Sequence, residues 1–320
     1  MKKPVALITG VTGFAGSFLA EELLAHGYDV AGTVYKNEPT DNIEAIKKDV
    51  CLAALDILKP DKCRRVINKI KPDYIFHLAA IASVGQSFRM ERLTFDINWN
   101  GTLNMLDAAV TLNGLKKFVF VGSADCYGIF NPKDKTLTEE QPFDPISPYG
   151  VSKAGAEMTT RYYARHYQLP VGIARPFNHS GPRQNENFVI PAFARQVALI
   201  EAGKQGPVVE VGDLSPRRDL SDVRDIVRGY RLIAEKGASG EVFHLCSGKT
   251  VSIQKVLDTL LKLSTRTIKV KTDRTRLRKA DIPILRGSNQ KAVNKLGFTI
   301  RYTLQETLKD TLDYWRDQIA

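Results

Sequence analysis

The sequence has few cysteines and histidines, and neither kind is grouped. Its four cysteines, Cys51, Cys63, Cys126 and Cys246, show no CxxC spacing and no framework of the kind that cross-links a small secreted domain. We therefore expect reduced thiols and a cytoplasmic protein. The five histidines are equally dispersed and form none of the usual zinc motifs, so no metal ion is expected.

Long apolar runs and internal repeats are also missing. No stretch of about 18 apolar residues occurs, so we expect no membrane-spanning helix and no membrane partner. The opening MKKPVALITG resembles a signal peptide, but Gly10, Gly13 and Gly16 interrupt its apolar run, and a first β-strand is the better interpretation. With 43% hydrophobic and 25% charged residues in 320, the composition is that of a globular protein with one large domain and a smaller companion.

Acidic residues are outnumbered, 35 against 46 basic ones, which gives a net charge of +11. Such a surplus indicates either nucleic acid or small ligands that carry several phosphates. Much of the excess lies in residues 266–279, and this stretch contains no aromatic residue to stack on bases. We therefore expect a phosphate-bearing small molecule as the partner and no nucleic acid.

Apolar runs of the β type alternate with helix-like segments through the first half of the chain. The runs are unbroken, which is typical of strands buried on both faces of a parallel sheet. They read VALIT at 5–9, DVAGTVY at 29–35, DYIFHLAA at 73–80, KFVFVGS at 117–123 and PVGIAR at 170–175. Residues 14–27 and 100–114 between them have helical spacing. This order predicts an α/β fold with a doubly wound parallel sheet of the Rossmann type.

The pattern changes after Pro176. FNHSGPRQNENF is a polar loop, and the later helices are separated by short β-type segments such as PVVEVGD at 207–213. One run, EVFHLC at 241–246, is apolar enough to return to the main sheet. We therefore expect a large domain at residues 1–175 and about 222–246, and a smaller, discontinuous α/β domain at about 176–221 and 247–320.

The first predicted strand runs directly into a glycine-rich loop, GVTGFAG at 10–16, and then into a helix. Glycines at such a place permit a tight turn and let backbone N–H groups at the helix N-terminus approach a pyrophosphate. The spacing is GxxGxxG rather than the more usual GxGxxG. Because strand, loop and helix stand in the required order, the large domain is predicted to bind a dinucleotide.

The end of the second predicted strand indicates which dinucleotide is bound. An acidic residue there would hold the ribose 2′-hydroxyl of NAD. The sequence instead reads Thr33, Val34, Tyr35, Lys36, with no carboxylate to repel a 2′-phosphate. NADP is therefore the expected cofactor, with NAD as the alternative, unless Lys36 simply points into water.

A later segment, SPYGVSKAGAE, places Tyr149 and Lys153 four residues apart, hence on one face of a helix, with Pro148 suited to its start. An adjacent ammonium stabilises phenolate, so we expect the pKa of Tyr149 to be drawn towards neutrality and the phenol to exchange a proton with substrate. By itself this spacing is common in helices and is weak evidence for catalysis. Together with the glycine loop and with Ser123, a hydroxyl at the end of an intervening strand, it becomes strong evidence.

These motifs together resemble the extended short-chain dehydrogenase/reductases of the sugar-nucleotide epimerase/dehydratase type, over nearly the whole chain. GVTGFAG, HLAA at 77–80, NWNGTLN at 98–104, VGSADCYG at 121–128, SPYGVSK and RPFNHSGP follow in the family's order. The resemblance implies that Ser123 bonds the substrate oxygen, Tyr149 exchanges the proton, and Lys153 holds the nicotinamide ribose. It also implies a dinucleotide site made by Gly10, Thr12, Gly13, Phe14, Gly16, Tyr35, Lys36, Asp56, Ile57, Leu78, Ala79, Ala80, Tyr149 and Lys153.

Within that family, the sequence is most similar to enzymes that handle GDP-mannose, the 4-keto-6-deoxymannose reductases and the 4,6-dehydratases. RPFNHSGPRQ, ENFVIPAFARQ, VGDLSPRRDLSDVRD and LRKADIPILRGSNQKAVNKLGF carry this likeness. It implies a nucleotide-sugar site made by Ser83, Asn178, Arg183, Phe188, Val189, Arg218 and Arg278. Each arginine has a second interpretation as a surface or interdomain salt bridge, above all Arg183. Lys279 stands where the family usually has proline, which departs from its pattern.

The residues after Ser123 bear on the reaction. In the dehydratases the corresponding stretch is threonine, serine, glutamate, and the glutamate performs the elimination, whereas this chain has Ser123, Ala124, Asp125. Because the carboxylate is one methylene shorter, Asp125 is poorly suited to elimination, and capping of the turn is as good an interpretation as catalysis. We therefore expect NADPH-dependent reduction of a GDP-linked 4-keto-6-deoxyhexose. The alternatives are a 4,6-dehydratase, a 4-epimerase and a dinucleotide-binding scaffold.

The resemblance finally implies an assembly. Family members commonly pair through the helices equivalent to about 100–113 and 149–167, so a homodimer is expected.

Overall fold

The structure is a computed structural model that describes residues 2–129, 136–276 and 282–320. Its larger part is built on a seven-stranded sheet in the order β10-β6-β5-β4-β1-β2-β3, with every neighbouring pair parallel. The strands are β1 (Val5–Thr9), β2 (Asp29–Val34), β3 (Val50–Ala54), β4 (Tyr74–His77), β5 (Lys117–Val121), β6 (Val171–Pro176) and β10 (Glu241–Leu245). The predicted doubly wound α/β fold is confirmed.

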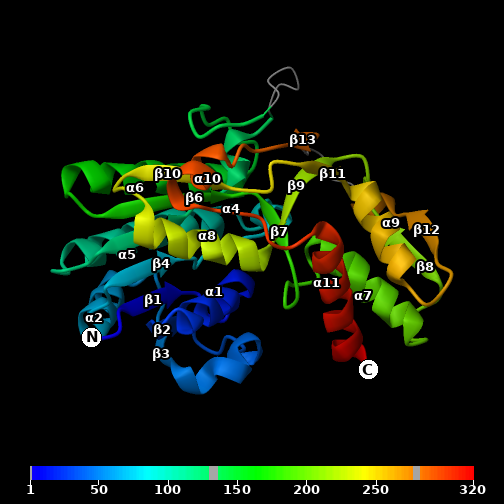
Figure 1. Cartoon of the computed structure of the whole chain (residues 1–320), viewed down its shortest axis with the longest axis horizontal. Coiled ribbons are helices and arrows are strands. Elements are labelled where there is room, and N and C mark those ends of the chain that lie inside the picture. Colours follow the sequence, from blue (N-terminus) through cyan, green and yellow to red (C-terminus); the bar gives the residue numbers. More distant parts are fainter. Residues whose placement is uncertain (1, 130–135, 277–281) are drawn as a thin grey trace.

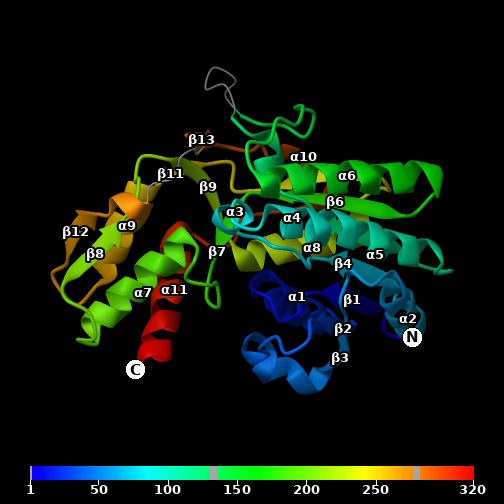
Figure 2. The ribbon, with the colours of Figure 1, turned by 180° about the vertical axis from the view of Figure 1, so that it is seen from behind.

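Helices cover both faces of this sheet, which explains the unbroken apolar strands. One face carries α1 (Phe14–Ala25), α8 (Val223–Lys236) and α10 (Gln290–Leu296), and α8 lies in front of the sheet in Figure 1. The other face carries α2 (Pro60–Ile70), α5 (Gly101–Val110) and α6 (Pro148–His166), and Figure 2 shows α5 and α6 from that side. Leu7 and Ile8 of β1 are both fully buried, one in each of the two cores.

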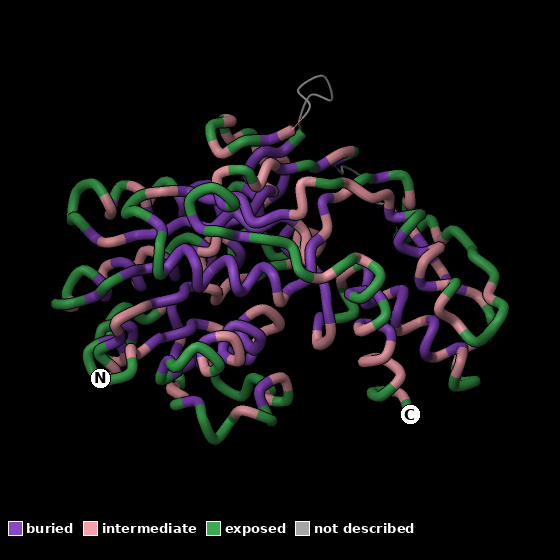
Figure 3. Tube along the Cα trace, in the orientation of Figure 1, coloured by how far each residue is buried: buried purple, intermediate pink, exposed green. Residues whose placement is uncertain are grey.

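The smaller part lies beyond the carboxyl ends of the central strands. Its core joins α7 (Val189–Glu201), α9 (Ile253–Leu263) and α11 (Leu304–Ile319) to the parallel pair β8 (Val208–Val211) and β12 (Lys269–Thr272). A four-stranded sheet of β7 (Asn178–Ser180), β9 (Arg217–Asp222), β11 (Thr250–Ser252) and β13 (Ile284–Leu285) lies between this core and the large sheet. Figure 3 shows buried residues running through both parts.

Short helical segments complete the described chain. They are η1 (Asp41–Asp49), α3 (Val84–Ser87), α4 (Glu91–Phe95), the π-helical turn η2 (Asp96–Asn100), η3 (Ala124–Tyr127) and η4 (Arg274–Arg276). The sequence-based prediction names no strand at β3, β7, β9, β11, β12 or β13. Of these, β3 is partly exposed at the sheet edge, and β7 has only three residues inside a polar loop.

One stretch departs from the predicted division of the chain. Residues 247–320 were expected in the smaller part, but Ala292 and Leu296 of α10, and Phe298 after it, belong to the core under the large sheet. α10 contacts α8 and β10 there. The division into two domains stays a proposal, with this helix returning to the larger one.

Candidate active site

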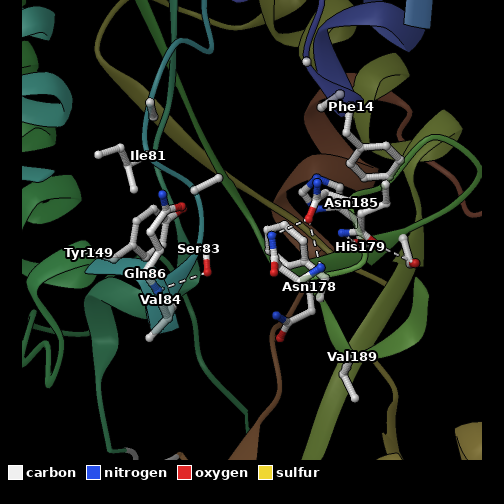
Figure 4. A pocket seen from close by; sticks show the side chains of 18 of the residues that line it. Phe14, Ile81, Ser83, Val84, Gln86, Tyr149, Asn178, His179, Asn185 and Val189 are labelled. Carbon is white, nitrogen blue, oxygen red and sulfur yellow. Dashed lines mark hydrogen bonds between the residues drawn. The ribbon is translucent and has the colours of Figure 1, made fainter. Parts of the chain in front are cut away.

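A cleft of about 1860 Å³ lies at the carboxyl edge of the large sheet. On one side it is lined by the loops that follow β1, β4 and β5, and on the other by β7, the loop before α7, and residues around β8 and β9. Figure 4 shows Tyr149 and Ser83 on one side, with Asn178, His179 and Asn185 across from them. In doubly wound sheets ligands bind at this edge, where the strand order reverses.

The glycine loop has the geometry that its spacing predicts. Gly10 has φ +72°, and a Cβ on Gly16 would lie 2.2 Å from the carbonyl oxygen of Gly10. Gly13 precedes α1 without a side-chain cap, so the first N–H groups of the helix face the cleft unscreened. The buried Thr12 Oγ1 has no hydrogen-bond partner among the described residues. A backbone cradle with an unpaired hydroxyl fits a dinucleotide pyrophosphate.

The loop after β4 is fixed to the glycine loop. Thr9 Oγ1 accepts hydrogen bonds from the N–H groups of Leu78 (3.0 Å) and Ala79 (3.1 Å), and a Cβ on Gly10 would lie 3.2 Å from the Ala79 Cα. Leu78, Ala79 and Ala80 consequently line the cleft beside the glycines. The structure therefore brings together two predicted segments that are about seventy residues apart in the chain.

Of the predicted dinucleotide residues that follow β2 and β3, most line the cleft and one does not. Tyr35, Asp56 and Ile57 line the cleft, and Asp56 Oδ1 accepts a hydrogen bond from the Leu58 N–H at 3.0 Å. Lys36 does not line it; this residue has φ +40° and its Nζ lies 5.2 Å from the ring centre of Tyr35. Lys36 is thus one residue beyond the wall of the cleft, beside the ring of Tyr35.

Ser123 and Asp125 bond to each other. Ser123 Oγ accepts from the Asp125 N–H at 3.1 Å, which caps the short helix η3, and donates to Asp125 Oδ2 at 3.1 Å. The capping group is thus the serine and not the aspartate. Ser123 is 5% exposed, and both side chains belong to residues that line the cleft.

Tyr149 and Lys153 lie on the predicted helix. Ser147 caps α6 by accepting from the Gly150 N–H at 3.1 Å, and Pro148 occupies the first helical turn. Tyr149 and Lys153 are both buried, and Tyr149 lines the cleft. Lys153 Nζ donates to the carbonyl oxygen of Val121 at 2.8 Å, one residue from the end of the strand that leads to Ser123. Ser123, Tyr149 and Lys153 therefore gather at one point.

The expectation for the pKa of Tyr149 is wrong in direction. Burial is the largest cause and the charge of Asp125 the second, and together they raise the pKa of this phenol well above its ordinary value, against a hydrogen bond from Ser123 that lowers it. Burial also lowers the pKa of Lys153 to about 8. The ammonium is directed at the Val121 carbonyl, so it does not offset the desolvation of the phenol.

Most residues predicted to hold the sugar nucleotide line the cleft. Ser83, Asn178, Phe188, Val189 and Arg218 do so from the loop before α3, from β7, from the start of α7 and from β9. The buried Oδ1 of Asn178 has no partner among the described residues, which suits a ligand donor. Arg278 lies outside the described residues.

Arg183 lines the cleft but has protein partners. Its guanidinium donates to Glu21 (2.7 Å), to Ser17 Oγ (3.2 Å) and to the Asn42 carbonyl (3.2 Å). It also lies 4.3 Å from the ring centre of Phe18. These contacts join the loop after β7 to α1, as in the second interpretation of this arginine.

Sequence reasoning missed several residues of the cleft. His179 stacks on Phe14, with ring centres 5.9 Å apart and planes 13° apart, and so joins the two walls. It lies inside the quoted RPFNHSGP motif, which was the available signal. Glu210, Tyr314 and Trp315 also line the cleft, from β8 and the distant α11, and no local pattern marks them.

The described ranges contain no group of three or more His, Cys, Asp or Glu side chains arranged to hold a metal ion. No helix within those same ranges is both long enough and apolar enough to cross a membrane.

A glycine cradle, a buried Ser, Tyr and Lys set, and a second wall with polar side chains define an extended short-chain dehydrogenase/reductase, a class of sugar-nucleotide oxidoreductases that use NAD(P). The family model for GDP-mannose 4,6 dehydratase matches residues 7–311. The chain belongs to this family.

Relatives and solved structures agree with that assignment. The chain is 32% identical to GDP-6-deoxy-D-mannose reductase of Pseudomonas aeruginosa, over 77% of this chain and 81% of the relative. It is 30% identical to GDP-mannose 4,6-dehydratase of Yersinia enterocolitica, over 96% and 91%. The structure of RMD from P. aeruginosa complexed with NADPH matches with a TM-score of 0.84, at 30% identity, over 99% and 100% of the two chains. A UDP-glucose 4-epimerase from Thermotoga maritima matches with a TM-score of 0.87, at 30% identity, over 99% and 100%.

Proposed function

We propose that this protein uses NADPH to reduce the C4 ketone of GDP-4-dehydro-6-deoxy-D-mannose, giving GDP-D-rhamnose or its C4 epimer. The observation that carries the proposal is the hydrogen bond from Ser123 Oγ to Asp125 Oδ2, at 3.1 Å, beside the small residue Ala124. In the free protein this bond holds the short carboxylate of Asp125 against the turn that contains it. A relative named as a GDP-6-deoxy-D-mannose reductase, at 32% identity, supports the same reaction.

The chain's own residues have separate tasks. Bound NADPH supplies the hydride for C4. When substrate binds, Ser123 turns its one hydroxyl proton from Asp125 to the ketone oxygen, and Tyr149, whose raised pKa keeps it protonated, gives that oxygen a proton. Lys153, held at the Val121 carbonyl, binds the ribose beside them. Reduction requires one proton donor, and Tyr149 fills that role.

Dehydration requires more than this set. Loss of water across C5 and C6 of the hexose needs a second acid/base group at those carbons. Asp125 lines the cleft two residues after Ser123, and its backbone is held in the turn that Ser123 caps. Because a misplacement of about 1 Å can cost about a hundredfold in rate, a short carboxylate on a fixed turn favours reduction.

The cofactor proposal is NADPH, with NADH as the weaker alternative. Thr12 Oγ1 and the N-terminus of α1 are suited to the pyrophosphate. Tyr35 and Lys36 directly follow β2, at the place where a carboxylate would select NAD. The complex of RMD with NADPH supports this preference.

The sugar nucleotide is proposed to bind across the cleft. Asn178 offers an unpaired buried Oδ1, and Arg218 lines the cleft from β9, where a guanidinium suits the diphosphate. Ser83, Phe188 and Val189 complete this wall, and Arg183 serves mainly to join it to α1.

The experiment supplies GDP-4-dehydro-6-deoxy-D-mannose and NADPH to the purified protein and follows absorbance and product NMR. We expect one NADPH consumed for each ketone reduced, and no turnover by Tyr149→Phe. If GDP-mannose alone becomes the ketone without net cofactor consumption, the protein is a dehydratase. Exchange between C4 epimers without net consumption would identify an epimerase, and NADPH binding without any turnover would identify a scaffold.

We also propose that two copies pair through α5, α6 and the turn before them. Apolar side chains are exposed along this face, among them Trp99 (39%), Val151 (38%), Met158 (63%) and Tyr162 (47%). Substituting Met158→Lys should convert a dimer to a monomer in light scattering. All four cysteines are unpaired, in keeping with the proposed cytoplasmic location.

A further inference from the structure

A fully buried arginine lies behind the catalytic set. Arg175, near the carboxyl end of β6, is 1% exposed, and its fork donates to Glu157 on α6: Nε to Oε2 at 2.8 Å and Nη2 to Oε1 at 2.7 Å. Glu157 is itself 0% exposed. This bidentate geometry fixes both the distance and the angle between the strand and the helix.

The remaining nitrogen of the same guanidinium reaches a different element. Arg175 Nη1 donates to the Tyr127 hydroxyl and to the Glu139 carbonyl, the latter at 3.0 Å. The Tyr127 hydroxyl also bonds His244 Nε2 on β10, at 2.5 Å. Burial lowers the pKa of His244 to about 3, so this imidazole is neutral and able to accept the phenolic proton. Each of the three guanidinium nitrogens of Arg175 therefore donates to at least one partner.

Glu157 and Tyr127, the two side chains that Arg175 bonds, belong to the two elements that position the catalytic groups, α6 and η3. Glu157 follows Tyr149 and Lys153 by two turns and one turn of α6, on the same face. Tyr127 is the last residue of η3, the short helix that Ser123 caps and that contains Asp125. Arg175 thus connects the element that places the proton donor to the element that places Ser123.

We propose that Arg175, Glu157 and Tyr127 are positioning residues that set the spacing between Ser123 and Tyr149. This inference rests on the proposed reduction, for which those two groups must meet one ketone oxygen. None of the three side chains lines the cleft, so they act through the elements that they hold.

Stability alone is a poor explanation of this cluster. Replacing a buried ion pair by apolar side chains is often neutral or stabilising, because desolvation of the charges offsets their attraction. The neighbouring cluster of Ala124, Phe177 and Cys246 shows that apolar packing is available at this place. Directional hydrogen bonds from one guanidinium hold two elements to within a fraction of an ångström, and catalysis is sensitive to about that displacement.

The first test removes one hydroxyl. Tyr127→Phe keeps both buried charges and the ring, so it should fold, and we expect kcat to fall about tenfold while KM for both substrates stays within about twofold. The matched control is Tyr163→Phe, which removes a phenol hydroxyl from α6, the helix of Tyr149; this hydroxyl bonds Asp107 on α5 and not Arg175. The control should retain kcat even where its melting temperature falls as much.

The second test removes the charge pair. The double variant Arg175→Met, Glu157→Met leaves no uncompensated buried charge and should remain folded. We expect a melting temperature near that of the wild type, unchanged NADPH binding by fluorescence, and kcat lower by about tenfold to a hundredfold.

The outcomes separate the two proposals. The positioning role would be overturned if both Tyr127→Phe and the folded double variant kept the kcat of the wild type. It would also be overturned if Tyr163→Phe lost as much kcat as Tyr127→Phe for the same fall in melting temperature. Failure of the proposed reduction would appear earlier, as absence of NADPH consumption by the wild type. In that case the same variants are measured on the dehydratase or epimerase reaction, where a retained kcat overturns the positioning role equally.

Discussion

The two walls of the cleft are built by different means. The wall from the first half of the chain is largely backbone: glycines, the N-terminus of α1, and the N–H groups of Leu78 and Ala79 held by Thr9. The wall from the second half is largely side chains, with Asn178, His179 and Arg218 reaching in from β7 and β9.

This difference explains why the residues of the first wall were easier to predict from the sequence. A backbone cradle requires glycine at fixed spacing, because a Cβ at Gly16 would meet the Gly10 carbonyl, and that requirement is visible in seven consecutive letters. A wall of side chains depends on which way each strand residue points, and neighbouring arginines such as Arg217 and Arg218 look alike in the sequence.

The largest expected effect is on the backbone wall. In Gly16→Ala the added Cβ would lie 2.2 Å from the Gly10 carbonyl oxygen, and only the loop backbone can move away. Since a displacement of about 1 Å misplaces the cradle, we expect NADPH binding to weaken by about a hundredfold, measured by fluorescence titration. Gly206→Ala, where nothing lies within 4 Å, is the control. Equal affinity in both variants would contradict a backbone cradle.

The side-chain wall is tested by two adjacent arginines. Arg218→Gln removes a guanidinium that lines the cleft, and a lost charge-assisted hydrogen bond to a diphosphate should raise KM for the sugar nucleotide about tenfold to a hundredfold. Arg217→Gln is matched, since that guanidinium bonds Thr250 on β11 instead. The same KM for both variants would remove Arg218 from the substrate site.

The two titratable side chains Asp125 and Tyr149, both on the first side of the cleft, are tested by pH. The Asp125 carboxylate raises the pKa of Tyr149 by disfavouring phenolate. In Asp125→Asn this charge is gone, so the pKa falls and the proton donor is lost at lower pH. We expect the alkaline limb of kcat/KM, where Tyr149 sets it, to begin at a lower pH in Asp125→Asn than in the wild type. Glu140→Gln, an exposed carboxylate, is the control, and an unmoved limb in Asp125→Asn would show that Tyr149 is not the titrating acid.

The smallest effect is expected at Arg183. Arg183→Gln breaks a partly exposed pair with Glu21, so the free energy of unfolding should fall by about 1 kcal/mol, and KM should stay within about twofold. Urea unfolding and steady-state kinetics measure the two quantities. A rise in KM as large as that expected for Arg218→Gln would indicate that Arg183 binds the sugar nucleotide.

Much of the fold followed from strand pattern alone. β1, β5, β6 and β10 lie where unbroken apolar runs predicted them, and α6 begins at Pro148 as expected. β3 was not predicted because a partly exposed edge strand needs little apolar character. The place of α10 in the larger core was not predicted because its packing partner α8 is distant in sequence.

The candidate site shows the same division. The family resemblance implied that Ser123, Tyr149 and Lys153 share one site, and in the structure Ser123 and Tyr149 line the same cleft with Lys153 bonded to the Val121 carbonyl nearby. The raised pKa of Tyr149 was not predictable, because burial depends on every neighbour and the direction of Lys153 on the position of the Val121 carbonyl.

The sequence by itself determined the doubly wound sheet and the glycine loop, because each depends on local periodicity or spacing, and its motifs indicated the candidate proton donor Tyr149. Only the tertiary structure decided that Arg183 joins the walls, that His179 stacks on Phe14, and that Arg175 connects η3 to α6. Those roles depend on contacts between elements far apart in the chain, which no local pattern encodes.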